Sequence, residues 1–244
     1  VASADGRTLY TTEIDLDSGT GLIGVRDADS MKKRDEWPTH GRDPHQLVWD
    51  VTPGNAGRLI VANGGVPTQP ETGRMRLDME HMDSSIVRLD TGNGELLGQW
   101  RLDDPRLSLR HLAWNGQRLG IALQAEHDDA TTKANAPLLA LFDGASLRAV
   151  PAPIPLAGYG GNVAAIGKGF AVSCPRAQGV ALYGAAGQWQ EFIPLEEAYQ
   201  LVAVGERLWA GGRSQALGMD ALDTTSNVVA PLPGIKLDNH WIAV

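Results

Sequence analysis

The chain has 244 residues, with 21 Lys and Arg against 29 Asp and Glu, so its formal charge is −8 with neutral histidines. This acidic balance argues against a protein that grips nucleic-acid phosphates, because such binding draws its affinity from Lys and Arg. Hydrophobic residues make up 43% of the chain, which is enough for a large core and argues against disorder. The single cysteine, Cys174, excludes an intramolecular disulfide. The sequence contains no run of 18 apolar residues, so it predicts no membrane-spanning helix.

Short apolar segments separated by Gly and Pro recur along the whole chain, which predicts strands rather than helices. Pairs of such strands, each pair joined by a Gly-containing turn or a short loop, lie in residues 1–12, 46–62, 112–123, 163–173 and 201–210. A third strand follows each pair, at residues 21–27, 85–90, 137–143, 179–183 and 216–220. A weaker fourth strand comes after each third strand.

A four-stranded unit that repeats about every 40–50 residues is typical of β-propeller blades. We therefore predict an all-β fold, a single β-propeller domain of four-stranded blades. The approximate blades are residues 1–44, 45–110, 111–161, 162–199 and 200–239, and residues 240–244 begin the next one. A β-sandwich with Gly-rich turns is the alternative, since it also has short strands at close spacing. Repetition of the whole unit favours the propeller.

The last predicted strand, residues 239–244, reads as the innermost strand of a blade and needs outer strands to pair with. The N-terminal segment is already used in the first predicted blade. We therefore expect the complete protein to have further blades upstream of Val1.

Several strings resemble a family of bacterial exported proteins known as domain of unknown function 1513. These strings are residues 11–27, 37–47, 61–66, 70–73 and 108–112, and the most specific are Asn63-Gly64-Gly65 and Pro44-His45-Gln46-Leu47. The resemblance covers essentially the whole chain. It implies a seven-bladed propeller of the YVTN and quinoprotein amine dehydrogenase group, exported to the periplasm, often by a twin-arginine signal. It also implies an association with exported iron or haem proteins, and it implies no established activity.

In a propeller, the loops before the innermost strands converge on one mouth of the central channel. The residues at these positions are His45, His111, Asn162, Gln200 and His240, with Arg110 directly before His111. The second strands end at the same mouth because they run antiparallel to the first, and the residues there include Glu13, Asn63, Gln124 and Cys174. We predict that these residues line a ligand-binding mouth. A channel lining that only holds ordered water is the open alternative.

The histidines of this predicted mouth are also candidate metal ligands, because imidazole suits Fe, Cu, Zn and Ni. The candidates are His45, His111 and His240, and the candidate cofactor is a divalent or transition metal.

Three functions are compatible with these features. The first is a periplasmic propeller without catalytic activity that binds a protein or a small-molecule ligand at the mouth. The second is a metal-dependent hydrolase similar to propeller lactonases, with Glu13, Asn63 and Asn162 as ligands and His111 or His240 as base. No axial Asp completes that set. The third is an accessory protein that handles iron or haem. The sequence has no Gly-rich phosphate loop and no Gly-x-Ser-x-Gly elbow, which favours the first function.

Overall fold

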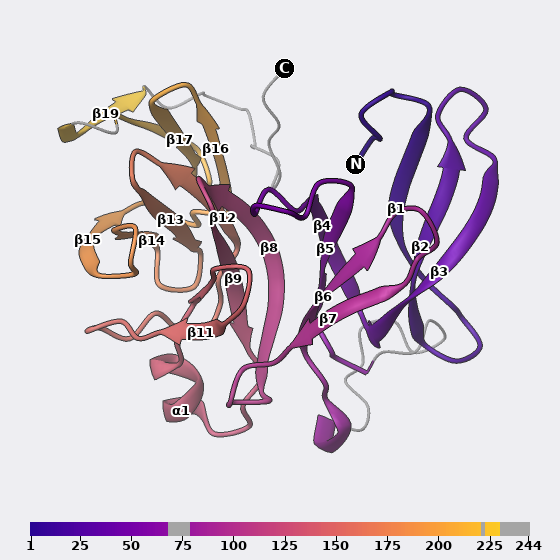
Figure 1. Cartoon of the computed structure of the whole chain (residues 1–244). Coiled ribbons are helices and arrows are strands. Elements are labelled where there is room, and N and C mark those ends of the chain that lie inside the picture. The colour runs from indigo at the N-terminus through magenta and orange to yellow at the C-terminus, as the bar shows by residue number, and fades with distance from the viewer. Residues whose placement is uncertain (68–78, 221–222, 230–244) are drawn as a thin grey trace. The chain divides into compact units, whose positions relative to one another are not determined.

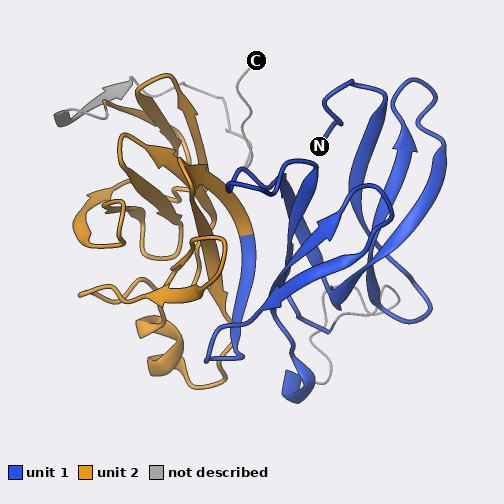
Figure 2. Cartoon of the chain, viewed as in Figure 1, with its two compact units in different colours: residues 1–110 blue, residues 111–244 orange. Residues whose placement is uncertain are grey.

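The computed structural model describes residues 1–67, 79–220 and 223–229 (Figure 1). These residues form antiparallel sheets in which strands adjacent in the chain are paired. The chain divides into two compact units, unit 1 with residues 1–110 and unit 2 with residues 111–244 (Figure 2). The blade limits and the single domain expected above stay predictions.

Unit 1 contains a three-stranded sheet in the order β1-β2-β3 and a four-stranded sheet in the order β4-β5-β6-β7. The elements are β1 (Thr8–Ile14), β2 (Thr20–Asp27), β3 (Lys33–Arg42), β4 (Pro44–Trp49), β5 (Arg58–Asn63), the 3-10 helix η2 (Met79–His81), β6 (Ser85–Asp90) and β7 (Leu96–Trp100).

The innermost strand expected at the start of the first blade is reduced to one bridge, between Ala2 and Leu9. The Tyr10 amide donates to the Val1 carbonyl at 2.8 Å, and the Val1 ammonium donates to the Tyr10 carbonyl at 2.9 Å. Since Ser3 is followed directly by a turn, only these first residues pair with β1, and the sheet itself has three strands.

Unit 2 contains three four-stranded sheets, in the orders β11-β10-β9-β8, β12-β13-β14-β15 and β16-β17-β18-β19. The elements are β8 (Leu107–Asn115, of which residues 111–115 belong to unit 2), β9 (Arg118–Ala125), α1 (Ala130–Asn135), β10 (Leu139–Phe142), β11 (Leu147–Val150), β12 (Asn162–Ile166), β13 (Gly169–Cys174), β14 (Gly179–Tyr183), β15 (Trp189–Pro194), β16 (Gln200–Val204), β17 (Arg207–Gly211), β18 (Ala216–Asp220) and β19 (Asp223–Val229).

The short helix α1 was not expected from the sequence. Asp129 caps it, because the Asp129 side chain accepts a hydrogen bond from the Thr132 amide at 2.7 Å. No helix among the described residues is long and apolar enough to cross a membrane.

The middle strands of unit 2 are buried on both faces, and their side chains alternate between two cores. In β13, Phe170, Val172 and Cys174 pack into the core shared with the β8–β11 sheet, whereas Ala171 packs into the core shared with the β16–β19 sheet. This alternation follows from the two-residue period of a strand. Runs of consecutive apolar residues therefore mark sheets that have neighbours on both sides.

A corresponding core joins the two sheets of unit 1. It contains Tyr10, Ile23 and Trp37 from the first sheet and Leu47, Leu59, Val61, Val87 and Leu89 from the second. Four-stranded antiparallel sheets stacked face to face in chain order are the blades of a β-propeller. The predicted fold class, all-β with propeller blades, is confirmed, and the complement of seven blades stays a prediction.

One polar contact is buried within the second sheet. The Asp50 carboxylate has no exposed side-chain surface and accepts a hydrogen bond from Arg88 Nε at 2.7 Å. Its other oxygen accepts bonds from the Thr52 amide at 2.8 Å and the Thr52 hydroxyl at 2.5 Å. The Arg88 guanidinium lies 5.1 Å from the centre of the Trp100 ring. Because both charges are buried, removing one of them leaves the other uncompensated and destabilises the fold.

Candidate functional site

The residues predicted to line the mouth fall into both units. Glu13, His45, Asn63 and Arg110 lie in unit 1; His111, Gln124, Asn162, Cys174 and Gln200 lie in unit 2; His240 lies outside the described residues. Asn162 and Gln200 are the first residues of β12 and β16, and Asn63 and Cys174 are the last residues of β5 and β13. It stays a prediction that all these residues line one common mouth.

The position of His111 within its strand differs from the prediction. β8 begins at Leu107, so His111 is an interior residue of the strand and not its start. The strand begins earlier because Leu107 and Leu109 are buried and the Ser108 hydroxyl donates to the Gly64 carbonyl at 2.7 Å. Arg110 is therefore also held within the strand.

In unit 1, a compact polar group surrounds Arg110, and we call it the Arg110 cluster: Asp43, His45, Gly64 and Arg110. One guanidinium nitrogen of Arg110, Nη1, lies 2.8 Å from Asp43 Oδ2 and 3.4 Å from His45 Nδ1. The Arg110 side chain is only 12% exposed and that of Asp43 19%. Arg110 Nε is buried and has no hydrogen-bond acceptor in the described part of the chain.

Backbone geometry brings Asp43 to Arg110. Asp43 has a φ of 54°, in the left-handed region, where Asp is more readily tolerated than most residues. Its carbonyl accepts a hydrogen bond from the Gly64 amide at 2.7 Å. A Cβ at Gly64 would lie 2.6 Å from Asp43 Oδ2 and 3.1 Å from Arg110 Cζ, so only glycine leaves room for this ion pair.

The contact with Arg110 indicates the protonation state of His45. A guanidinium has only donors, so His45 Nδ1 accepts in this contact when the ring proton is on Nε2. In that tautomer the Nδ1 lone pair faces Arg110. His45 is thus a polar wall of the cluster, and its role as a metal ligand stays a prediction.

Asn63, which directly precedes Gly64, is completely buried. Its Nδ2 donates to the Thr39 carbonyl at 2.9 Å and lies 3.4 Å from the Ser85 hydroxyl. Its Oδ1 is buried with no hydrogen-bond donor among the residues that the structure describes. The side chain holds the end of β3 against β5, since a Cβ at Gly41 would lie 2.5 Å from Asn63 Nδ2.

In unit 2, the starts of neighbouring innermost strands meet. Asn162 Nδ2 lies 3.4 Å from the Leu201 carbonyl, and the Ser173 hydroxyl donates to the Tyr199 carbonyl at 2.6 Å. Gln200 is 2% exposed, and its Nε2 has no acceptor among the described residues. Gln200 covers Gly211, because a Cβ there would lie 2.0 Å from Gln200 Nε2. Gln124 is bridged to Tyr159 in the loop before Asn162.

Glu13 is fully engaged by neighbours on its own sheet. One carboxylate oxygen binds Arg26 at 2.6 Å and the Thr11 hydroxyl at 2.7 Å, and the other binds Lys33 at 3.0 Å. Burial by itself raises the pKa of Glu13, but these bonds outweigh it and lower the pKa from 4.5 to about 2. This carboxylate is a structural charge partner and does not fit the metal ligand of the hydrolase alternative.

Cys174 is completely buried, and its thiol contacts the Val172 carbonyl at 3.4 Å. Burial raises the pKa of Cys174 to about 12. The thiolate, which is the form that binds metals, is therefore absent at neutral pH. Within the described residues, no group of three or more His, Cys, Asp or Glu is arranged to hold a metal ion.

Asp43 was not among the predicted site residues. Its position two residues before His45 was the available signal, but pairing with Arg110 joins positions far apart in the chain. Tyr199 was also missed, although it directly precedes Gln200. Its ring meets that of Tyr159 edge to face at 6.3 Å, and Arg176 lies 4.6 Å from the Tyr159 ring centre.

Comparisons with known proteins agree with this architecture. Residues 1–244 match the family described as "Protein of unknown function (DUF1513)", which confirms the resemblance seen in the sequence. No curated protein matches the chain. The structure is similar to that of Kuenenia stuttgartiensis hydrazine synthase, with a TM-score of 0.60 at 13% identity, over 93% of this chain and 69% of that one. It is also similar to the computationally designed Ika8 protein, with a TM-score of 0.58 at 9% identity, over 93% of this chain and 63% of that one. At these identities the likeness concerns the fold alone.

Proposed function

We propose that this chain, which belongs to the DUF1513 family of proteins of unknown function, is a binding protein and not an enzyme. Its ligand presents a carboxylate or another oxygen acceptor to the Arg110 cluster. The observation that carries this proposal is Arg110 Nε, a buried donor with no acceptor among the described residues, on a guanidinium already fixed by Asp43.

The energetics support a ligand at this position. A buried donor without an acceptor costs about 1–3 kcal/mol, so an oxygen supplied by a ligand or a water molecule offsets that cost. The guanidinium is the side chain best suited to bind a carboxylate, because its donors lie in one plane. Asp43 and His45 fix the orientation of that plane before a ligand arrives, which lowers the entropy lost on binding.

The same residues speak against the metal-dependent hydrolase. Glu13 is held by Arg26 and Lys33, and His45 Nδ1 faces the Arg110 guanidinium. A divalent ion would have to compete with these cations for both side chains. A role in handling iron or haem, which the family resemblance suggested, gains no support from the described residues for the same reason.

Export to the periplasm is part of the proposal and rests on the family resemblance in residues 37–47 and 61–66. Fractionation of cells that express the complete protein tests it. Recovery of the protein in the cytoplasmic fraction contradicts this part without affecting the binding proposal.

The binding proposal is tested by calorimetric titration of the protein with succinate, with uncharged butane-1,4-diol as the reference probe. We expect succinate to bind, and Arg110→Met to abolish binding. The matched control is Arg101→Met, since Arg101 also pairs with a carboxylate, that of Asp83 at 2.6 Å and 2.8 Å, but is 48% exposed. Binding should survive in that control.

Loss of folding in Arg110→Met is checked by its circular dichroism, and Arg110→Lys provides a second variant that keeps the charge but not the planar donors. No binding of succinate by the intact protein, or equal binding by Arg110→Met and Arg101→Met, overturns the proposal. Turnover of lactones or esters at enzyme-like rates overturns the statement that the protein is not an enzyme.

A further inference from the structure

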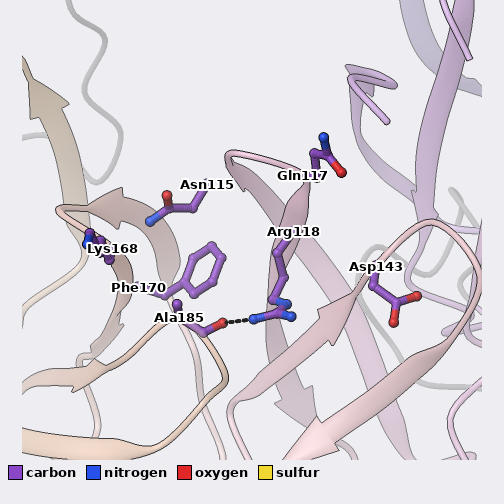
Figure 3. Close-up of a pocket in the computed structure, with 7 residues that line it drawn as sticks. All are labelled: Asn115, Gln117, Arg118, Asp143, Lys168, Phe170 and Ala185. Atoms are coloured by element: carbon purple, nitrogen blue, oxygen red, sulfur yellow. Dashed lines mark hydrogen bonds between the residues drawn. The ribbon is translucent and has the colours of Figure 1, made fainter. Parts of the chain in front are cut away.

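A hollow lies in unit 2, formed by turns of two neighbouring sheets (Figure 3). Its volume is about 420 Å³, within the range of small-molecule sites. The β8–β9 turn contributes Asn115, Gln117 and Arg118, the β10–β11 turn contributes Asp143, and the β12–β13 hairpin contributes Lys168 and Phe170. None of these residues was among the predicted site residues, and none belongs to the Arg110 cluster.

The walls of this hollow are fixed before any ligand enters. Arg118 Nη1 donates to the Ala185 carbonyl, as the dashed line in Figure 3 shows. Asn115 Nδ2 donates to the Gly169 carbonyl at 2.7 Å. These bonds tie the β8–β9 turn to two turns of the β12–β15 sheet. A site held in this way binds with little loss of conformational entropy.

The accessible walls carry both polar and apolar atoms in about equal measure. Phe170 is completely buried, so its ring lies behind the surface, whereas Gln117, Asp143 and Lys168 are exposed and Asn115 and Arg118 are half-buried. The hollow therefore presents two amides, two cations and one carboxylate. The charged and amide groups among these walls favour a ligand that carries charges of its own.

The charges are separated along the hollow. Figure 3 shows Lys168 and Asp143 on opposite sides, with Arg118 between them. Asp143 Oδ1 accepts hydrogen bonds from the amides of Ser146 at 2.8 Å and Ala145 at 3.0 Å. These backbone bonds lower the pKa of Asp143, so its carboxylate is ionised at neutral pH. One end of the hollow is thus cationic and the other anionic.

We propose that this hollow binds a small zwitterion, an amino acid or a short peptide, with its carboxylate at Arg118 and Lys168 and its ammonium group at Asp143. The separated charges match the two ends of such a ligand, and a simple dianion meets repulsion from Asp143. The amides of Asn115 and Gln117 lie at the same turn as Arg118 and provide hydrogen bonds for peptide groups. This site is independent of the function proposed above.

Triglycine is the probe, compared with N-acetyl-triglycine, which lacks the ammonium group, and triglycine amide, which lacks the carboxylate. Binding is measured by isothermal titration at low and high salt. We expect free triglycine to bind most tightly and each capped peptide to bind about 3- to 5-fold more weakly. We expect 0.5 M NaCl to lower the affinity for free triglycine.

Variants assign each end of the ligand. Asp143→Asn keeps the turn, because an Asn side chain accepts the same backbone hydrogen bonds. It should lower the affinity for triglycine but not that for N-acetyl-triglycine. Lys168→Gln should lower the affinity for triglycine but not that for triglycine amide. Lys32→Gln is the matched control, since Lys32 is an exposed lysine in unit 1, and should change nothing.

Three results overturn the proposal: no binding of triglycine, equal affinity for the free and capped peptides, or an effect of Lys32→Gln equal to that of Lys168→Gln. Arg110→Met separates the two proposals. It should abolish succinate binding and leave triglycine binding unchanged.

Discussion

The buried pair of Asp50 and Arg88 gives the sharpest test of how this fold is held together. Asp50 has no exposed side-chain surface, and Arg88 is only 10% exposed. In Arg88→Met the Asp50 carboxylate keeps its bonds from Thr52 but loses the only cation that the described residues place on it. Methionine keeps an unbranched apolar side chain at this position, so the main change is the loss of the guanidinium and its polar contacts.

Removing one partner of a buried ion pair costs about 3–5 kcal/mol, because an uncompensated charge is left in a poorly solvated place. For a chain of this size each kcal/mol lowers the melting temperature by about 2–4 °C. We therefore expect Arg88→Met to lower the melting temperature by roughly 6–20 °C. The assay is thermal unfolding followed by circular dichroism at pH 7.

The double variant Asp50→Asn/Arg88→Met removes both charges and keeps an acceptor for Thr52. We expect it to recover at least half of the lost stability, because no buried charge remains. Arg101→Met is the control, since its exposed pair with Asp83 should contribute less than about 1 kcal/mol. The reasoning is refuted if Arg88→Met melts no lower than Arg101→Met, or if the double variant is as unstable as the sum of its single changes.

Three further predictions concern stability and reactivity. Because its pKa is lowered, Glu13 stabilises the folded protein fully above pH 4.5, and this stabilisation is lost as the pH falls toward 2. Its cationic partners are partly exposed, so we expect the free energy of unfolding of wild type to fall by about 1 kcal/mol more than that of Glu13→Gln between pH 5 and pH 2.5. Urea unfolding measures this difference, and equal losses would contradict the prediction. Cys174, whose pKa burial raises to about 12, should not react with a thiol reagent at pH 8 until urea unfolds the protein, and fast labelling of native protein would show that the strand end opens. Gly120→Ala places a Cβ 2.5 Å from the Phe170 ring and should cost about 1–3 kcal/mol in thermal unfolding, and an unchanged melting temperature would show that the ring moves aside freely.

Most strands could be read from the sequence because their signals are local. β18 (Ala216–Asp220) and β14 (Gly179–Tyr183) have the predicted limits, since each is a short apolar run bounded by turns. The order of strands in the sheets follows from connections too short for anything but antiparallel neighbours. The first sheet is the exception, because its innermost strand pairs only through Ala2.

The sites depended on contacts that local patterns do not encode. The sequence placed Asn63, Asn162 and Gln200 at strand ends, because a strand end is a local property. It did not pair Arg110 with Asp43, and it put His111 at the start of a strand that begins at Leu107. Register and side-chain pairing depend on which buried neighbours a strand meets.

The sequence by itself therefore determined the all-β class, the repeating strands and the residues at several strand ends, because short apolar runs and Gly-rich turns act over a few residues. Only the tertiary structure decided which charges meet. The Asp50–Arg88 pair, the Arg110 cluster and the hollow at Arg118 each join residues from different strands or sheets, and such contacts arise only when the sheets pack.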